Sequence, residues 1–225
     1  MTLAATTRSH KHVLTPWSKQ GAVGGPTFVR GEGSYMYDDA GKRYLDLSAG
    51  LVSNNLGHGH PAVVKAIQDQ VAKIAYVPPS LIHDVRSEFG ALLSEISPWE
   101  EGARTFFGTA GGQANEDAVA ISRMITGRQK VLTAYRSFHG SAPGAGNLTG
   151  EDRRWAHEPG MPGVVHFFAP YPYRSPFFTD DPQVETQRAL EHLEQVISDM
   201  RSHYGRTTYA AYGALLAASA FQAHD

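Results

Sequence analysis

A glycine-rich segment at residues 108–112, Gly-Thr-Ala-Gly-Gly, is the clearest place in this chain to bind an anion. It lies between a segment that predicts a strand and one that predicts a helix. Backbone N–H groups and the helix dipole converge at such a connection, which suits a phosphate. Gly111 and Gly112 also let the backbone approach a ligand closely. The simpler alternative is a tight strand-to-helix turn that holds no ligand.

The spacing of these glycines argues against two common nucleotide-binding loops. No Gly-Lys-Ser/Thr follows, so the segment is not a Walker loop. The spacing also differs from the Gly-x-Gly-x-x-Gly of dinucleotide-binding proteins. We therefore expect neither ATP nor NAD at this place.

A second segment, Tyr-Arg-Ser-Phe-His-Gly at residues 135–140, directly follows another predicted strand. The loops at the carboxyl ends of parallel strands form a shared ligand crevice, so we expect both segments to line it. Phe138 offers a ring that can stack on a flat heteroaromatic ligand. The alternative is that Phe138 belongs to the core and that His139 is a satisfied polar group.

The elements that must position these segments alternate between strands and helices. This alternation predicts an α/β fold with a mostly parallel sheet and flanking helices. The predicted strands are 104–107, 130–134 and 164–168, and the predicted helices are 113–126 and 184–198. After Asp199 the sequence becomes polar and then rich in Ala and Tyr, so we expect no further strand there.

The N-terminal part has a different pattern. Residues 1–30 predict an irregular arm, and a β-hairpin follows, with strands at 35–37 and 43–47. Two helices come next, one from Pro61 to Ile74 and one that Asp84 can cap. Their apolar residues recur at helical spacing and are expected to face inward: Val63, Val64, Ile67, Val71 and Ile74, then Phe89, Leu92, Leu93 and Ile96.

We divide the chain into three parts on this basis. Residues 1–75 hold the arm, the hairpin and the first helix. Residues 76–199 hold the first part of the α/β domain, and residues 200–225 form a divergent tail.

Composition narrows the function classes. The net charge is -2 and there is no cysteine, so we expect no nucleic-acid partner, no disulfide and no thiolate chemistry. No apolar run is long enough to span a bilayer, and no signal peptide is visible, so we expect a cytoplasmic protein without a membrane partner.

Other constellations favour structural roles. His58 and His60 are candidate metal ligands together with His139, His157 or His166. No carboxylate has ligand spacing to them, so we expect no metal. Asp46 and Glu116 are candidates for an acid–base pair. For Glu116, placed in the first turn of a helix, compensation of the helix dipole is the simpler interpretation.

The motifs together closely resemble the class III aminotransferases, the omega-amino-acid group of the fold-type I pyridoxal-phosphate (PLP) enzymes. The resemblance covers residues 12–199. Besides residues 108–116 and 135–140, it includes Tyr-Leu-Asp-Leu-Ser-Ala-Gly at 44–50 and Asn-Leu-Gly-His-Gly-His-Pro at 55–61. Among subfamilies the chain looks most like the taurine–pyruvate and β-alanine–pyruvate aminotransferases.

The resemblance implies a cofactor site in part of a fold-type I large domain. Gly111 and Gly112 would hold the PLP phosphate, Phe138 would stack on the pyridine ring with His139 beside it, and Leu51 and Val52 would face the substrate. The family often has Ser or Thr in place of Gly112, so a hydroxyl contact is missing. It usually has Tyr or Trp in place of Phe138, so a polar ring group is lost.

The residues that would complete the chemistry are absent. The family uses an Asp beside the pyridine nitrogen and a Schiff-base lysine, and no lysine follows Lys130. Lys65 and Lys73 lie on the polar face of a predicted helix, and Lys130 opens a strand, so none is a good candidate. We therefore assign no catalytic residue.

Two hypotheses follow. In the first, the chain is the N-terminal portion of an aminotransferase that moves an amino group from an omega-amino compound to a 2-oxo acid such as pyruvate. The change after Asp199 then suggests a truncated or frame-shifted product that is inactive alone. In the second, it is a non-catalytic fragment that associates with a full-length subunit. The family resemblance implies a homodimer.

Overall fold

A computed structural model of the chain describes residues 9, 11–99, 102–204 and 209–211. The chain folds into two compact units that divide between Phe89 and Gly90. Within the first unit, Gln70 Nε2 lies 3.3 Å from His83 Nε2.

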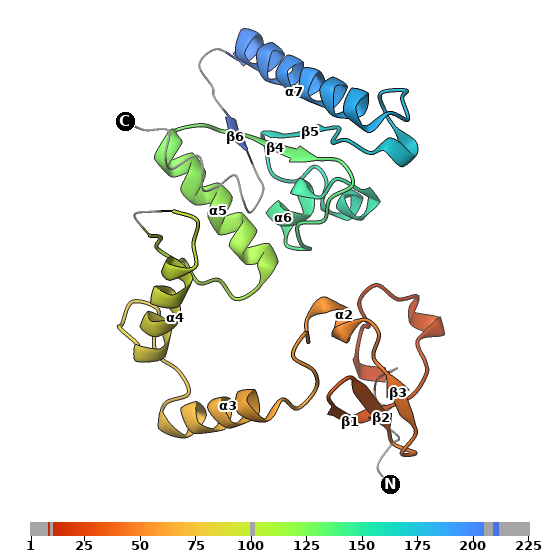
Figure 1. The fold of residues 1–225 in the computed structure, drawn as a ribbon, viewed down its shortest axis with the longest axis vertical. Helices are drawn as coiled ribbons and strands as arrows, with labels where there is room; N and C mark the ends of the chain where they lie inside the picture. The colour runs from red at the N-terminus through yellow and green to blue at the C-terminus, as the bar shows by residue number, and fades with distance from the viewer. Residues whose placement is uncertain (1–8, 10, 100–101, 205–208, 212–225) are drawn as a thin grey trace. The chain divides into compact units, whose positions relative to one another are not determined.

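The first unit contains a three-stranded antiparallel sheet (Figure 1). It consists of β1 (Phe28–Glu32), β2 (Tyr35–Asp38) and β3 (Arg43–Leu45). The predicted hairpin is confirmed as β2 and β3. The expectation that residues 1–30 are irregular is wrong at its end, where β1 begins at Phe28. The β1 segment is mostly exposed and holds Gly and charged residues, and it is a strand because it pairs with β2.

The hairpin turn is fixed by one buried carboxylate. Asp38 is 8% exposed and accepts hydrogen bonds from the backbone N–H groups of Ala40 and Lys42 and from the Tyr44 hydroxyl. Burial alone would raise the pKa of Asp38, but these donors lower it below the ordinary value.

Two helices follow the first sheet in sequence, α3 (Pro61–Lys73) and α4 (Asp84–Glu95). Both helices are confirmed, and Pro61 is the first helical residue as predicted. The expectation that their apolar faces are buried is wrong, since Ile67 of α3 is 62% exposed and Leu92 of α4 is 51% exposed. Ile96, just after α4, is 69% exposed. The apolar residues at helical spacing on α3 and α4 would be buried only against a neighbouring surface, and the described residues do not supply one.

The second unit contains a parallel sheet in the order β5-β4-β6. Its strands are β4 (Lys130–Ala134), β5 (Val164–Phe167) and β6 (Tyr209–Ala211). In register, Val131 faces Val164 on one side and Ala210 on the other. The α/β fold with a parallel sheet is therefore confirmed.

Two strand predictions in this unit are wrong. Residues 104–107 are not a strand, because they join no ladder and both sides of β4 are taken by β5 and β6. Conversely, β6 lies after Asp199, where no strand was expected. Its Tyr-Ala-Ala sequence has no β-branched residue, so pairing with β4 rather than local propensity determines it.

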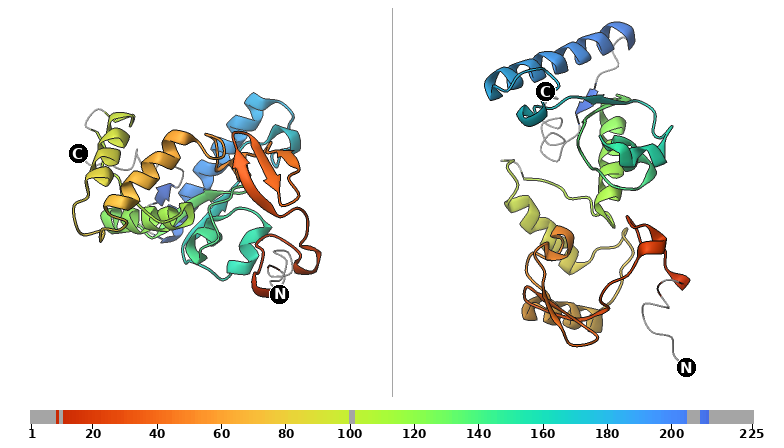
Figure 2. Two further views of the ribbon diagram at one scale, coloured as in Figure 1. Left: turned by 90° about the horizontal axis from the view of Figure 1, so that it is seen from below. Right: turned by 90° about the vertical axis from the view of Figure 1, so that its right-hand side faces the viewer.

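Helices cover both faces of this sheet (Figures 1 and 2). On one side lie α5 (Gly111–Thr126) and α6 (Pro143–Leu148), and on the other lies α7 (Pro182–Tyr204). A small core joins Val119 of α5, Val131 of β4 and Leu148 of α6. This core packs β4 against α5 and α6. The segment 135–140 follows the carboxyl end of β4.

Shorter elements complete the two units. The first unit has a 3₁₀ helix, η1 (Gln20–Ala22), and a single turn, α2 (Ala49–Val52). The second unit has the 3₁₀ helices η2 (Asp152–His157) and η3 (Pro172–Arg174). Among the described helices, none has both the length and the apolar character needed to cross a membrane.

Candidate cofactor site

The amino end of α5 is built to accept an anion. Gly111 and Gly112 are its first two residues, so the helix begins two residues earlier than predicted. Ala110, the N-cap residue, has no side chain that can accept from the first N–H groups. A Cβ added to Gly111 would meet nothing within 4 Å, so the space on that side of Gly111 is open.

The two predicted segments meet at a pair of glycines. A Cβ added to Gly140 would lie 2.7 Å from the Cα of Gly112. Gly140 also has a φ of 126°, which disfavours a residue with a side chain. The structure therefore brings Gly111 and Gly112 together with the segment that carries Phe138 and His139.

Phe138 presents a partly exposed ring close to this contact. Its side chain is 43% exposed, and the guanidinium carbon of Arg153 lies 4.2 Å from the ring centroid. Arg153 also forms an ion pair with Glu151. Such an aromatic ring can stack on a planar ligand, as the sequence suggested.

His139 is anchored inward by hydrogen bonds. Its Nε2 lies 3.2 Å from the hydroxyl oxygen of Thr133, and that hydroxyl donates to the Leu148 carbonyl at 2.9 Å. The Thr133 oxygen must then accept, which places the imidazole proton on Nε2. The backbone N–H of His139 donates to the Thr149 hydroxyl at 3.1 Å. These bonds match the interpretation of His139 as a satisfied polar group.

A second histidine extends this network. His166 Nε2 donates to the Thr149 carbonyl at 3.1 Å, and the ring stacks on Tyr135 with 5.1 Å between centroids. Burial lowers the pKa of His139, and the charge of His166 lowers it further. Burial also lowers the pKa of His166. Both effects favour neutral rings at neutral pH.

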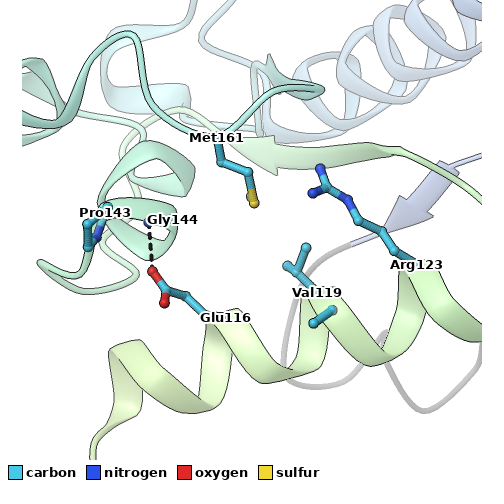
Figure 3. A pocket seen from close by; sticks show the side chains of 7 residues that line it. Glu116, Val119, Arg123, Pro143, Gly144 and Met161 are labelled. Carbon is cyan, nitrogen blue, oxygen red and sulfur yellow. Dashed lines mark hydrogen bonds between the residues drawn. The ribbon is translucent and has the colours of Figure 1, made fainter.

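Glu116 has a different role from the one predicted. It is not in the first turn of its helix, because α5 begins at Gly111. Its Oε1 accepts from the backbone N–H groups of Gly144 at 2.6 Å and Ala145 at 3.1 Å, as Figure 3 shows for Gly144. Asn115, which no local sequence pattern marks as a site residue, donates from Nδ2 to the His139 carbonyl at 2.6 Å.

A shallow pocket lies along α5 beside this contact (Figure 3). It has a volume of about 300 Å³ and is lined by Glu116, Val119, Ala120, Arg123, Pro143, Gly144 and Met161. The Arg123 side chain is tied to the Pro162 carbonyl at 2.7 Å. None of the predicted cofactor-binding residues lines this pocket.

Leu51 and Val52, the predicted substrate-facing residues, lie in the first unit. They belong to α2, whose backbone is a left-handed turn: φ is positive at Ala49, Gly50, Leu51 and Val52. The Leu51 and Val52 side chains are 64% and 76% exposed. A left-handed turn that includes three non-glycine residues is strained. Strain of this kind often marks functional segments.

Asp46 holds this turn in place. Its carboxylate accepts from the N–H of Gly50 at 2.8 Å, from the N–H and hydroxyl of Ser48, and from His58 Nε2 at 3.0 Å. The hydrogen bond from His58 is the main cause of its lowered pKa. Asp46 thus has a structural role. No group of three or more candidate ligands among the described residues is arranged to hold a metal.

Within the second unit, no lysine lies near the amino end of α5. Lys130 is the only lysine in that unit, and it opens β4 at the end opposite to the segment 135–140. Lys65 is exposed and paired with Asp69 at 2.9 Å, as expected for a solvated position. Lys73 is exposed at the carboxyl end of α3.

These residues fit the two ends of a PLP molecule. The open space at Gly111, and the backbone N–H groups of Gly111 and Gly112 at an N-terminus without a side-chain cap, suit its phosphate. Phe138 is partly exposed and lies two residues before Gly140, which contacts Gly112. Its ring suits the pyridine ring of PLP.

Similarity to known proteins agrees with this geometry. The chain is 34% identical over 166 residues to the acetylornithine aminotransferase of Methanosarcina mazei, which covers 73% of this chain and 40% of that protein. It is 35% identical over 140 residues to the acetylornithine aminotransferase of Bacillus cereus, covering 62% of this chain and 36% of that protein. The chain thus spans less than half the length of these relatives.

A solved structure of taurine:2-oxoglutarate aminotransferase from Bifidobacterium kashiwanohense, in complex with PLP and glutamate, is similar over 93% of this chain and 47% of its own. The TM-score is 0.80 at 30% identity. The profile of the family described as Aminotransferase class-III matches residues 21–204. The chain therefore belongs to the class-III aminotransferases, a family of PLP-dependent transaminases.

Proposed function

We propose that this chain forms the PLP-binding part of an omega-aminotransferase, which moves an amino group from an omega-amino compound to a 2-oxo acid such as pyruvate. The observation that carries the proposal is the contact between Gly112 and Gly140. In a chain of this family, it joins an anion-binding helix end to a loop with an exposed aromatic ring. The named activity of the taurine:2-oxoglutarate relative supports an omega-amino donor.

Each site residue then has a stated part. Gly111 and Gly112 bind the phosphate through backbone N–H groups, Phe138 stacks on the pyridine ring, and His139 lies beside it. Leu51 and Val52 contact the substrate from the left-handed turn. When bound, PLP supplies an electron sink for breaking bonds at the amine-bearing carbon.

The chain does not complete the reaction alone in this proposal. The amine that holds the cofactor and moves the substrate proton must come from a lysine, and Lys130 lies at the wrong end of β4. We therefore propose that catalysis requires residues outside this sequence. A homodimeric parent enzyme is part of the same proposal.

Cofactor binding is the direct test. PLP should acquire visible circular dichroism when added to the chain, and Gly111→Val should abolish the signal by filling the phosphate space. Reduction with borohydride followed by mass spectrometry should find no PLP–lysine adduct. Absence of dichroism would reject the cofactor site. An adduct together with turnover of taurine and pyruvate, or taurine and 2-oxoglutarate, would reject the proposed dependence on other residues.

A second candidate is a non-catalytic fragment that associates with a full-length aminotransferase subunit. It is favoured by the exposed apolar faces of α3 and α4, where Ile67 and Leu92 are more than half exposed. Co-expression with a full-length class-III enzyme and gel filtration tests it. Co-elution is expected, and elution of the two chains in separate peaks would reject this candidate.

A further inference from the structure

We infer that Asn115 and Glu116 are positioning residues that hold the 138–145 loop against the phosphate-binding end of α5. The inference rests on the proposed function, in which one cofactor contacts both Gly111–Gly112 and Phe138. Neither side chain is assigned a contact with the cofactor. They act by fixing the distance between the two ends of its site.

The first attachment is the hydrogen bond from Asn115 Nδ2 to the His139 carbonyl, at 2.6 Å. It joins residues 24 positions apart in the sequence. Asn115 is only three residues after Gly112 on the same helix, and His139 directly follows Phe138. This one bond therefore links the helix end that binds phosphate to the loop that carries the aromatic ring.

The second attachment is the Glu116 carboxylate at the start of α6. Ala142, the N-cap of α6, has no side-chain acceptor, and Pro143 has no N–H. Gly144 and Ala145 therefore carry the first N–H groups of α6 that need an acceptor, and Glu116 Oε1 accepts from both. Figure 3 shows this carboxylate reaching from α5 across to α6.

The backbone is shaped to permit both attachments. A Cβ on Gly144 would lie 2.8 Å from Glu116 Oε1, and one on Gly140 would lie 2.7 Å from the Cα of Gly112. The loop is thus fastened at His139, Gly140 and Gly144–Ala145, all just after Phe138. Preorganisation of this kind improves the binding of a ligand that must reach both ends of its site.

Hydrogen exchange of the chain without cofactor tests the attachments themselves. Asn115→Ala removes one hydrogen bond and should accelerate amide exchange in residues 138–145 by about tenfold. Glu116→Ala removes two and should accelerate it by at least as much. Glu116→Gln keeps an acceptor oxygen and should restore most of the protection. Met124→Ala, on an 81% exposed side chain of the same helix, is the matched control. Unchanged exchange in the alanine variants would overturn the inference.

Binding separates positioning from simple stabilisation. Dissociation constants for PLP and for inorganic phosphate are measured on the same variants. Glu116→Ala should weaken PLP binding about tenfold and leave phosphate binding unchanged, because the helix end stays intact while Phe138 loses its position. The double variant with both Glu116→Ala and Phe138→Ala should bind PLP as tightly as the single variant Phe138→Ala.

The outcomes for the two proposals differ. If the unaltered chain binds PLP no more tightly than phosphate, the proposed cofactor site fails and hydrogen exchange alone decides the positioning role. If the chain binds PLP and Glu116→Ala and Asn115→Ala bind it equally well, the positioning role fails and the cofactor site stands. Equal loss of PLP and phosphate binding would also overturn the positioning role, since it indicates a general loss of structure.

Discussion

At the scale of single residues, Gly140 sets how closely the two parts of the candidate site approach. Gly140→Ala should lower the free energy of unfolding by about 2 kcal/mol, because the methyl group overlaps Gly112 and the φ of 126° is unfavourable for alanine. PLP binding should weaken as well. Chemical denaturation and visible circular dichroism measure the two effects.

Gly90→Ala is the matched control for this change. Gly90 lies within α4, where an added Cβ meets nothing within 4 Å, so alanine should stabilise the chain by roughly 0.5–1 kcal/mol. Equal effects of the two substitutions would contradict the close approach of Gly140 to Gly112.

The partly buried His139 and His166 predict a dependence on pH. The folded-state pKa values of His139 and His166 are lowered below their ordinary value of about 6.5. The unfolded chain therefore takes up protons first as the pH falls, and the free energy of unfolding of the second unit should decrease below about pH 6.5. NMR titration of the two rings gives the midpoints directly. Midpoints at or above the ordinary value would contradict the burial that we describe.

At the scale of elements, one buried carboxylate joins α7 to the loop that follows β5. Glu185 is 0% exposed and accepts from the Tyr171 N–H at 2.7 Å and from the Ser175 hydroxyl. Glu185→Ala should lower the free energy of unfolding by about 3 kcal/mol, because the Tyr171 N–H and the Ser175 hydroxyl lose their acceptor and a buried side chain is removed. Glu191→Ala, at an exposed position of the same helix, should change it by less than about 0.5 kcal/mol. Similar losses in thermal or urea unfolding would contradict this role.

Elements with strong local signals were predictable from the sequence. The apolar run of β4 and the Pro61 start of α3 gave correct positions because local chemistry determines them. The strand expected at 104–107 did not form, and β6 formed without a local signal. In both cases the outcome depends on which neighbour is present to complete a ladder.

The candidate site was predictable to a similar extent. Gly111 and Gly112 are marked by their residue type and their place at the start of a helix, and Phe138 by its place after β4. The structure brings their segments together. The hydrogen bonds of Asn115 and Glu116 cross 24 to 29 residues of sequence. No local pattern marks such contacts, because they arise only when α5 and α6 pack together.

At the scale of the whole molecule, we expect the exposed apolar side chains to promote aggregation of the isolated chain. Ile67→Lys should reduce the aggregated fraction and leave the melting temperature unchanged, since the Ile67 side chain is 62% exposed. Light scattering and calorimetry measure the two quantities. Gln68→Lys, at an exposed polar position of the same helix, adds the same charge and is the control. A lower melting temperature in Ile67→Lys alone would show that this side chain is needed inside the fold.

The left-handed turn at Ala49–Val52 has a consequence for laboratory evolution. Each non-glycine residue in this conformation costs roughly 1–2 kcal/mol, so glycine or asparagine at Ala49, Leu51 or Val52 should raise stability. A screen for heat resistance should therefore enrich such changes. In our proposal the same positions contact substrate, so a screen for turnover in the parent enzyme should retain larger apolar side chains there. Parallel libraries at these codons would diverge according to the selection applied.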